Sequence, residues 1–200
     1  MRKFDKSFLK AVVIVHGKSE KQMCDYIKSN LRLKLEIYGD KNGEKSIQIT
    51  SIMRTLNNTK FETLSKFRAH FSDAFSETGR KKSGIHEKKF KIFIIMDTDD
   101  CNDVELENFK NKDMFIKHWA YRYIVPIWNT PDLEEVLVKA KIPFRKKGNR
   151  RKEEYVDIFP VSDKYATSDR VQLADLMELL SDNPDTNLEE FIKFCLEIAH

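Results

Sequence analysis

Short apolar runs alternate with amphipathic segments along this chain. Four runs are rich in β-branched and aromatic residues and have the length of strands: 10–15 (KAVVIV), 35–38 (LEIY), 90–96 (FKIFIIM) and 121–127 (YRYIVPI). The run at 90–96 is continuous rather than alternating, which indicates burial on both faces, as in a parallel sheet covered by helices. Pro126 near the end of the fourth run is typical of a strand at the sheet edge.

The segments between and after these runs have the spacing of amphipathic helices. We expect one helix after Ser19, which would cap it, and others from residues 50–51 and over 59–75, 132–140, 168–181 and 187–199. Five apolar residues share one face of the 59–75 segment: Phe61, Leu64, Phe67, Phe71 and Phe75. We expect this face to pack on the sheet rather than to bind a ligand.

Strands alternating with helices predict an α/β fold with a parallel sheet flanked by helices and a C-terminal helical extension. At 200 residues the chain is expected to form a single compact unit. We divide it into an α/β core over 1–140, a basic loop and connecting segment over 141–167, and C-terminal helices packed on the core over 168–200.

Composition excludes several classes of protein. A hydrophobic fraction of 40% and a charged fraction of 34% are typical of a globular protein rather than a disordered one. No apolar run approaches the roughly 20 residues that a membrane span needs, and the apolar stretch 11–15 is too short for a signal peptide. We therefore expect a cytoplasmic protein with no membrane partner.

Charge is distributed unevenly, although the net charge is only +4. Residues 141–152 carry seven Lys or Arg and no acid, residues 80–91 carry six with one Glu, and residues 97–107 hold six acids. Each basic stretch is either a solvated face or a surface that draws a polyanion toward the acidic segment. The candidates for nucleic-acid contact are Lys18, Arg145, Lys146, Lys147, Arg150 and Arg151.

Three aspartates, Asp97, Asp99 and Asp100, directly follow the most apolar run. Carboxylates this close repel one another unless they are protonated or bind a cation. Oxygen ligands without a nearby His or Cys cluster favour Mg²⁺ or Mn²⁺ over zinc. The alternative is that these acids only cap the next helix or solvate a loop.

A second polar cluster, His16-Gly17-Lys18-Ser19-Glu20, follows the first strand. Parallel strands place their carboxyl ends at one edge, so this cluster and the aspartates should meet there. Glu20 would then complete a metal site, or it would only stabilise a helix N-terminus.

These two clusters resemble the Toprim domain of topoisomerases, primases, OLD-family nucleases and RloB-like proteins of prokaryotic defence loci. The likeness rests on a strand followed by Gly17-x-x-Glu20 and, about eighty residues later, on an apolar strand ending in Asp97-x-Asp99. A third similarity is the Asn129–Pro131 turn followed by a helix bearing Glu134, with one extra residue between Asn and Pro. The resemblance covers roughly residues 10–140.

The resemblance implies a sheet of about four parallel strands and a metal site formed by Glu20, Asp97 and Asp99. Asp100 is a further candidate ligand, and Glu134 an additional acid. His16 stands where the family usually has an acid, and it could transfer protons, ligate a metal or mark an inactive site.

The leading hypothesis is a Mg²⁺-dependent nuclease that cleaves DNA or RNA in phage defence, with His16, Glu20, Asp97 and Asp99 as catalytic residues. A partner ATPase is a further expectation from the resemblance. The alternatives are an inactive Toprim-like module that binds nucleic acid or a partner, and a manganese-dependent glycosyltransferase using Asp-x-Asp. A haloacid-dehalogenase phosphatase fits less well, because Cys101 stands where that motif has Thr or Val.

Overall fold

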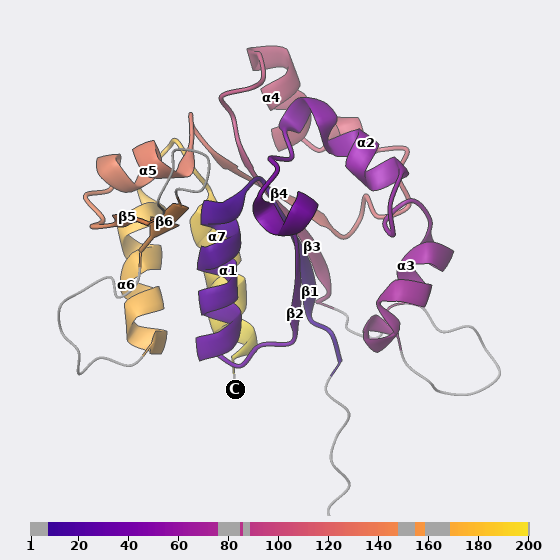
Figure 1. Cartoon of the computed structure of the whole chain (residues 1–200), viewed down its shortest axis with the longest axis horizontal. Helices are drawn as coiled ribbons and strands as arrows, with labels where there is room; N and C mark the ends of the chain where they lie inside the picture. The colour runs from indigo at the N-terminus through magenta and orange to yellow at the C-terminus, as the bar shows by residue number, and fades with distance from the viewer. Residues whose placement is uncertain (1–7, 76–84, 86–88, 148–154, 159–168, 200) are drawn as a thin grey trace, which may run out of the picture.

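A four-stranded parallel sheet forms the centre of the protein. The computed structural model describes residues 8–75, 85, 89–147, 155–158 and 169–199 (Figure 1). The strands are β1 (Ala11–Val15), β2 (Leu35–Tyr38), β3 (Lys91–Asp97) and β4 (Ile124–Asn129), and they lie in the order β2-β1-β3-β4. All three pairings are parallel, which confirms the expected α/β sheet and places every carboxyl end at one edge.

Helices cover both faces of the sheet (Figure 1). One face is covered by α1 (Lys18–Asn30), α5 (Leu133–Lys139), α6 (Asp169–Ser181) and α7 (Leu188–Ile198). The other is covered by α2 (Ile52–Asn57), α3 (Leu64–His70) and α4 (Asp103–Lys110). Four 3₁₀ turns join these elements: η1 (Asp40–Gly43), η2 (Ile49–Ser51), η3 (Ser72–Ala74) and η4 (Asp113–Phe115). An antiparallel hairpin, β5 (Arg145–Lys147) with β6 (Tyr155–Asp157), lies beside α5.

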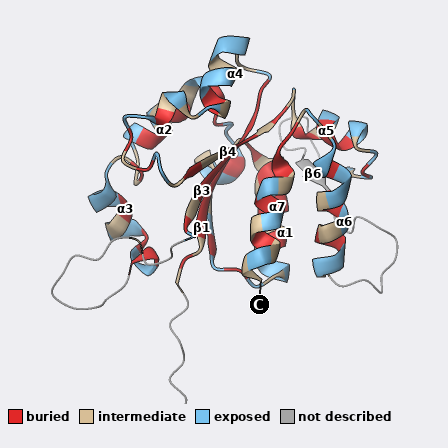
Figure 2. Cartoon of the chain, turned by 180° about the vertical axis from the view of Figure 1, so that it is seen from behind, coloured by how far each residue is buried: buried red, intermediate tan, exposed pale blue. Residues whose placement is uncertain are grey.

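The two inner strands are buried on both sides, as Figure 2 shows. In β1, Val13 and Val15 pack toward α1 and α7, whereas Val12 and Ile14 pack toward α2 and α3. All four are fully buried. Because successive strand residues point to opposite faces, a strand between two helical layers must be apolar at every position. This explains the continuous runs in the sequence.

The predicted helix over 59–75 is wrong in extent. The only α-helix there is α3, which the 3₁₀ turn η3 follows. The Thr63 hydroxyl caps the start of α3 by accepting a hydrogen bond from the Lys66 N–H at 3.1 Å. Phe61, Phe67 and Phe71 still pack together under the sheet, with ring centroids 4.6–6.2 Å apart. Leu64 was expected on this face but is 42% exposed.

Other boundaries differ more modestly from the predictions. The fourth strand begins at Ile124 rather than at residue 121, and α4 was considered only as a helix that the aspartates would cap. The α1 helix begins one residue before Ser19, with Gly17 as its N-cap. Part of the basic 145–152 segment is strand β5 rather than loop. The two C-terminal helices form where the periodicity predicted them.

The turn before α7 closes the outer edge of β4. The Asn187 side chain accepts a hydrogen bond from the Trp128 N–H at 3.0 Å and donates one to the Pro126 carbonyl at 3.1 Å. These are the two backbone groups that a neighbouring parallel strand would use. Pro126 therefore lies in an edge strand, as expected.

No helix among the described residues is long and apolar enough to cross a membrane.

Candidate functional site at the carboxyl edge of the sheet

The turns after β1 and β3 lie side by side. Val15 is in register with Ile95, and the His16 N–H continues the ladder by donating to the Ile95 carbonyl at 2.8 Å. The His16 Nε2 atom is 3.8 Å from Asp97 Oδ2. Direct pairing of β1 with β3 therefore brings the first polar cluster to the acidic turn, as the sequence predicted.

Glu20 lies beneath this edge and is only 2% exposed. Its Oε2 atom accepts a hydrogen bond from the Gly17 N–H at 2.9 Å, so the carboxylate caps the helix that begins at Lys18. Gly17 has no side chain of its own to cap the helix, which leaves that task to Glu20. The N-terminal role considered as an alternative for Glu20 is therefore real, and it coexists with the closeness of this acid to Asp97.

Asp97 ends β3 and is 8% exposed. Burial raises its pKa well above the ordinary value, and the nearby carboxylates of Glu20, Asp132 and Asp99 raise it further. A hydrogen bond from Asn129 Nδ2 to Asp97 Oδ1, 3.4 Å long, acts in the opposite direction.

The pKa of Glu20 is also raised, mainly by burial and in smaller part by Glu134. His16 and the Gly17 N–H oppose this shift. Glu20 and Asp97 are thus two buried acids whose charges disfavour each other. Such a pair favours either a shared proton or a bound cation.

The three aspartates of the turn have different surroundings. Asp99 is exposed and close enough to raise the pKa of Asp97. Asp100 turns toward the start of η2, where its Oδ2 accepts hydrogen bonds from the Thr50 hydroxyl at 2.9 Å and the Thr50 N–H at 3.3 Å. Asp100 therefore links this turn to the segment that begins η2, and it does not cap the helix that follows the turn. The helix that follows is capped by Asn102 instead.

The segment after β4 adds two more acids, Asp132 and Glu134, to the same edge. Asp132 caps α5 by accepting a hydrogen bond from the Glu135 N–H at 2.9 Å. Glu134 forms an ion pair with Lys146 at 3.0 Å. Glu134 and Asp132 influence Glu20 and Asp97 respectively through their charges. Sequence reasoning included Glu134 but missed Asp132.

His16 has two differently placed ring nitrogens. Its side chain is 13% exposed and directs Nε2 toward Asp97, while Nδ1 is buried without a hydrogen-bond partner among the described residues. A buried imidazole nitrogen with no hydrogen-bond partner is unusual in a folded protein, and a catalytic role is one of the explanations for it.

The basic candidates are only partly described. Arg145 and Lys146 are exposed on β5, which also contains Lys147, and Arg150 and Arg151 lie outside the described residues. The Lys146–Glu134 ion pair ties this strand to the site. Lys18 is the half-buried first residue of α1.

The basic stretch 80–91 reaches the opposite end of the sheet. Its described end, at Lys91, enters β3 at the amino end of that seven-residue strand, whereas Asp97 ends it. Lys91 is thus remote from the acidic edge, which favours the solvated-face interpretation for this end of the stretch.

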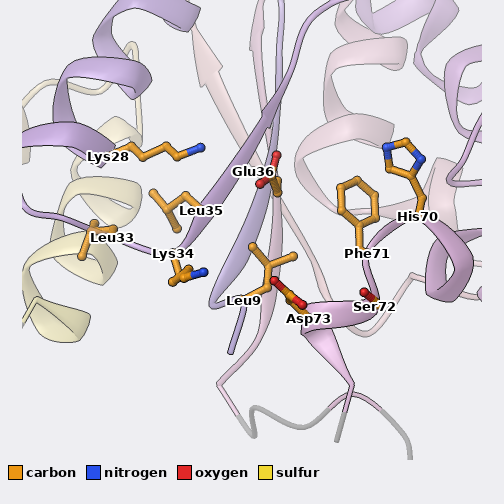
Figure 3. A pocket seen from close by; sticks show the side chains of 10 residues that line it. All are labelled: Leu9, Lys28, Leu33, Lys34, Leu35, Glu36, His70, Phe71, Ser72 and Asp73. Carbon is orange, nitrogen blue, oxygen red and sulfur yellow. The ribbon is translucent and has the colours of Figure 1, made fainter. Parts of the chain in front are cut away.

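A pocket of about 400 Å³ also lies at the amino ends of the strands (Figure 3). Leu9 and Leu35 contribute apolar wall, and Lys28, Glu36 and His70 contribute charged or polar groups of both signs. Because Leu35 begins β2, this pocket is separated from Asp97 by the length of the sheet. It is not part of the carboxyl-edge site.

The side chains at the carboxyl edge have the right chemistry to bind a hard divalent cation, because carboxylate oxygens are the ligands that Mg²⁺ and Mn²⁺ prefer. Within the residues that the structure describes, no three acidic, histidine or cysteine side chains already lie at metal-ligand spacing. Glu20 is turned back onto Gly17. Joint ligation by Glu20 and Asp97 would therefore use Glu20 Oε1 or give up this hydrogen bond.

Comparisons with models of known protein families, with curated proteins and with solved structures found no match to this chain. The functional argument accordingly rests on the geometry of the carboxyl edge.

Proposed function

We propose that this protein is a metal-dependent nuclease that hydrolyses phosphodiester bonds in DNA or RNA. The observation that carries the proposal is the meeting of two buried carboxylates, Glu20 and Asp97, beside His16 at the carboxyl edge of a parallel sheet. By resemblance to OLD and RloB-like proteins, the proposed setting is antiviral defence, with a partner ATPase as a further proposal.

Each side chain of the edge has a proposed task. Glu20, Asp97 and the exposed Asp99 would hold Mg²⁺ or Mn²⁺, which when bound polarises a phosphate and lowers the pKa of bound water. His16 would transfer a proton, because an imidazole changes its protonation state near neutral pH. Lys18, Arg145 and Lys146 would contact the sugar-phosphate backbone without reading sequence.

A basic strand next to an acidic site supports this assignment. The ion pair from Lys146 to Glu134 fixes β5 beside the helix that follows β4. A polyanion lying along β5 would thus be led toward the carboxylates, whose charge would otherwise repel it. A cation bound between Glu20 and Asp97 would offset that repulsion at the point of cleavage.

A second candidate function is a Toprim-like module that binds nucleic acid without cleaving it. The observation that favours it is the engagement of Glu20 as a helix cap, together with His16 at the position where the family usually has an acid. In that case the basic strand would act alone, and binding would not depend on the carboxylates.

One experiment separates these two functions. The double substitution Asp97→Asn with Asp99→Asn should abolish Mg²⁺-dependent cleavage of labelled single- and double-stranded oligonucleotides while the far-UV circular dichroism is unchanged. Asp103→Asn, an exposed aspartate in the first turn of α4, is the matched control and should cleave normally. Undiminished cleavage by the double variant would refute the nuclease. Oligonucleotide binding that is equal in Mg²⁺ and in EDTA, with no cleavage by the wild-type chain in Mg²⁺, would favour the binding module.

A further inference from the structure

A buried hydrogen-bond chain runs from the C-terminal helical pair to Asp97. The Leu188 N–H donates to Thr186 Oγ1 at 3.1 Å, and the Thr186 hydroxyl donates to Asn129 Oδ1 at 3.0 Å. Asn129 Nδ2 then donates to Asp97 Oδ1 at 3.4 Å. The side chains of the chain are buried: Asn129 is fully buried, Thr186 is 6% exposed and Asp97 8%.

The two ends of this chain favour one direction for its bonds. A backbone N–H can only donate, so the Thr186 oxygen accepts from Leu188, and its own proton is available for Asn129 Oδ1. Asn129 therefore presents its carbonyl oxygen to Thr186 and its amide N–H to Asp97. An ionised carboxylate can only accept, which agrees with this order. The reverse orientation of the amide would place its oxygen against an ionised Asp97 carboxylate, with two acceptors facing each other.

This arrangement divides the two oxygens of Asp97 between different partners. Oδ1 is held by the amide of Asn129, whereas Oδ2 is turned toward His16. We propose that Asn129 and Thr186 are positioning residues that fix the Asp97 carboxylate so that Oδ2 is the oxygen presented to the cation. The inference rests on the proposed metal-dependent function.

The helical pair after residue 168 is thereby part of the site. Besides the Thr186 contact, the Thr130 N–H donates to the Asp185 carbonyl at 2.8 Å, so the turn before α7 is fixed to the end of β4 at two points. Hydrogen bonds that orient a metal ligand typically change metal affinity by 10–100-fold when they are removed. Loss of the Thr186 hydroxyl should therefore lower the affinity of the site that contains Asp97 for a metal ion.

Manganese binding measured by electron paramagnetic resonance tests this inference, because free Mn²⁺ gives a signal that is lost on binding. Thr186→Val replaces the hydroxyl by a methyl group and should weaken Mn²⁺ binding to the full chain about tenfold. Thr186→Ser restores the hydroxyl and should restore the affinity. Both are measured at a fixed pH, without nucleic acid, on samples whose thermal melts show a folded protein.

Thr63→Val is the matched control for general loss of stability. The Thr63 hydroxyl also accepts a hydrogen bond at a helix start, from Lys66, but it lies on the opposite face of the sheet. Its substitution should leave Mn²⁺ affinity unchanged. Equal affinity of Thr186→Val and the wild-type chain would overturn the positioning role alone, as would failure of Thr186→Ser to recover binding. A wild-type chain that binds no Mn²⁺ would overturn the proposed function and this inference with it.

Discussion

Neutralising Asp97 should stabilise the metal-free protein while removing its function. Asp97 is 8% exposed, and its pKa is raised by burial and by Glu20, so its ionised form is disfavoured in the folded state. Asparagine has nearly the same shape, and its oxygen can still accept the hydrogen bond from Asn129. We therefore expect Asp97→Asn to increase the free energy of unfolding in EDTA at pH 8.

The size of this gain follows from the environment of the carboxylate. Replacing buried ion pairs by neutral residues of similar volume is often neutral or stabilising by about 1–4 kcal/mol, and we apply this range to the buried Asp97 carboxylate. For a chain of this length, each kcal/mol raises the melting temperature by about 2–4 °C. A rise on the order of 5 °C is the expected result in a thermal melt followed by circular dichroism.

The pH dependence of the stability gain tests whether the raised pKa of Asp97 is its cause. In the unfolded chain the carboxyl ionises with a pKa of about 3.9, whereas in the folded protein the pKa is higher. Ionisation therefore costs stability progressively as the pH rises from about 4 through the folded-state pKa. The advantage of Asp97→Asn should accordingly be small at pH 4 and largest at pH 8.

Asp99→Asn is the control, because Asp99 belongs to the same turn but is exposed. It should shift the melting temperature little at either pH. An Asp97→Asn variant that melts no higher than the wild-type chain at pH 8, or an equal gain in Asp99→Asn, would refute the reasoning.

Two further predictions concern the surface of the site. Lys146→Ala should weaken oligonucleotide binding and lower the slope of log K against log salt by about one, measured by fluorescence anisotropy. Lys66→Ala is the control for this substitution. The Lys66 side chain is 57% exposed, against 56% for Lys146, and it likewise forms an ion pair, with Glu62. Equal effects of the two substitutions would exclude a specific role for β5. Burial raises the pKa of the Cys101 thiol to about 11. Labelling of this thiol by iodoacetamide, followed by mass spectrometry, should therefore be slow at pH 8 and accelerate toward pH 11. Rapid labelling at pH 8 would contradict the raised pKa.

The sequence predicted the sheet because its signal there is local. A strand buried on both faces must be apolar at every position, and the run before Asp97 meets that requirement without reference to the rest of the chain. The meeting of Glu20 with Asp97 could also be predicted, since both follow strands that end at the same edge. The helix over 59–75 failed because a single cap at Thr63 divides a segment whose apolar spacing looks continuous.

Long-range polar contacts were beyond the reach of sequence reasoning. Asp97 and Asp100 are chemically identical, and only Thr50, which lies fifty residues earlier, makes Asp100 a structural link between loops. Thr186 is 57 residues from Asn129, and neither residue type by itself indicates a role beside a carboxylate. Such pairings depend on how the strands and the last helix meet, which hydrophobic periodicity does not encode.

The side chain of Asn187 has a consequence for assembly. By occupying the Pro126 carbonyl and the Trp128 N–H, it takes the place of a fifth strand, and no polypeptide can extend the sheet beyond β4 without displacing it. At the opposite edge, the exposed charges of Lys34, just before β2, and of Glu36 within it disfavour pairing with another strand. Both edge strands are thus protected from pairing with a strand of another molecule, which is a route to aggregation. The Asn187 side chain protects β4, and charged side chains protect β2.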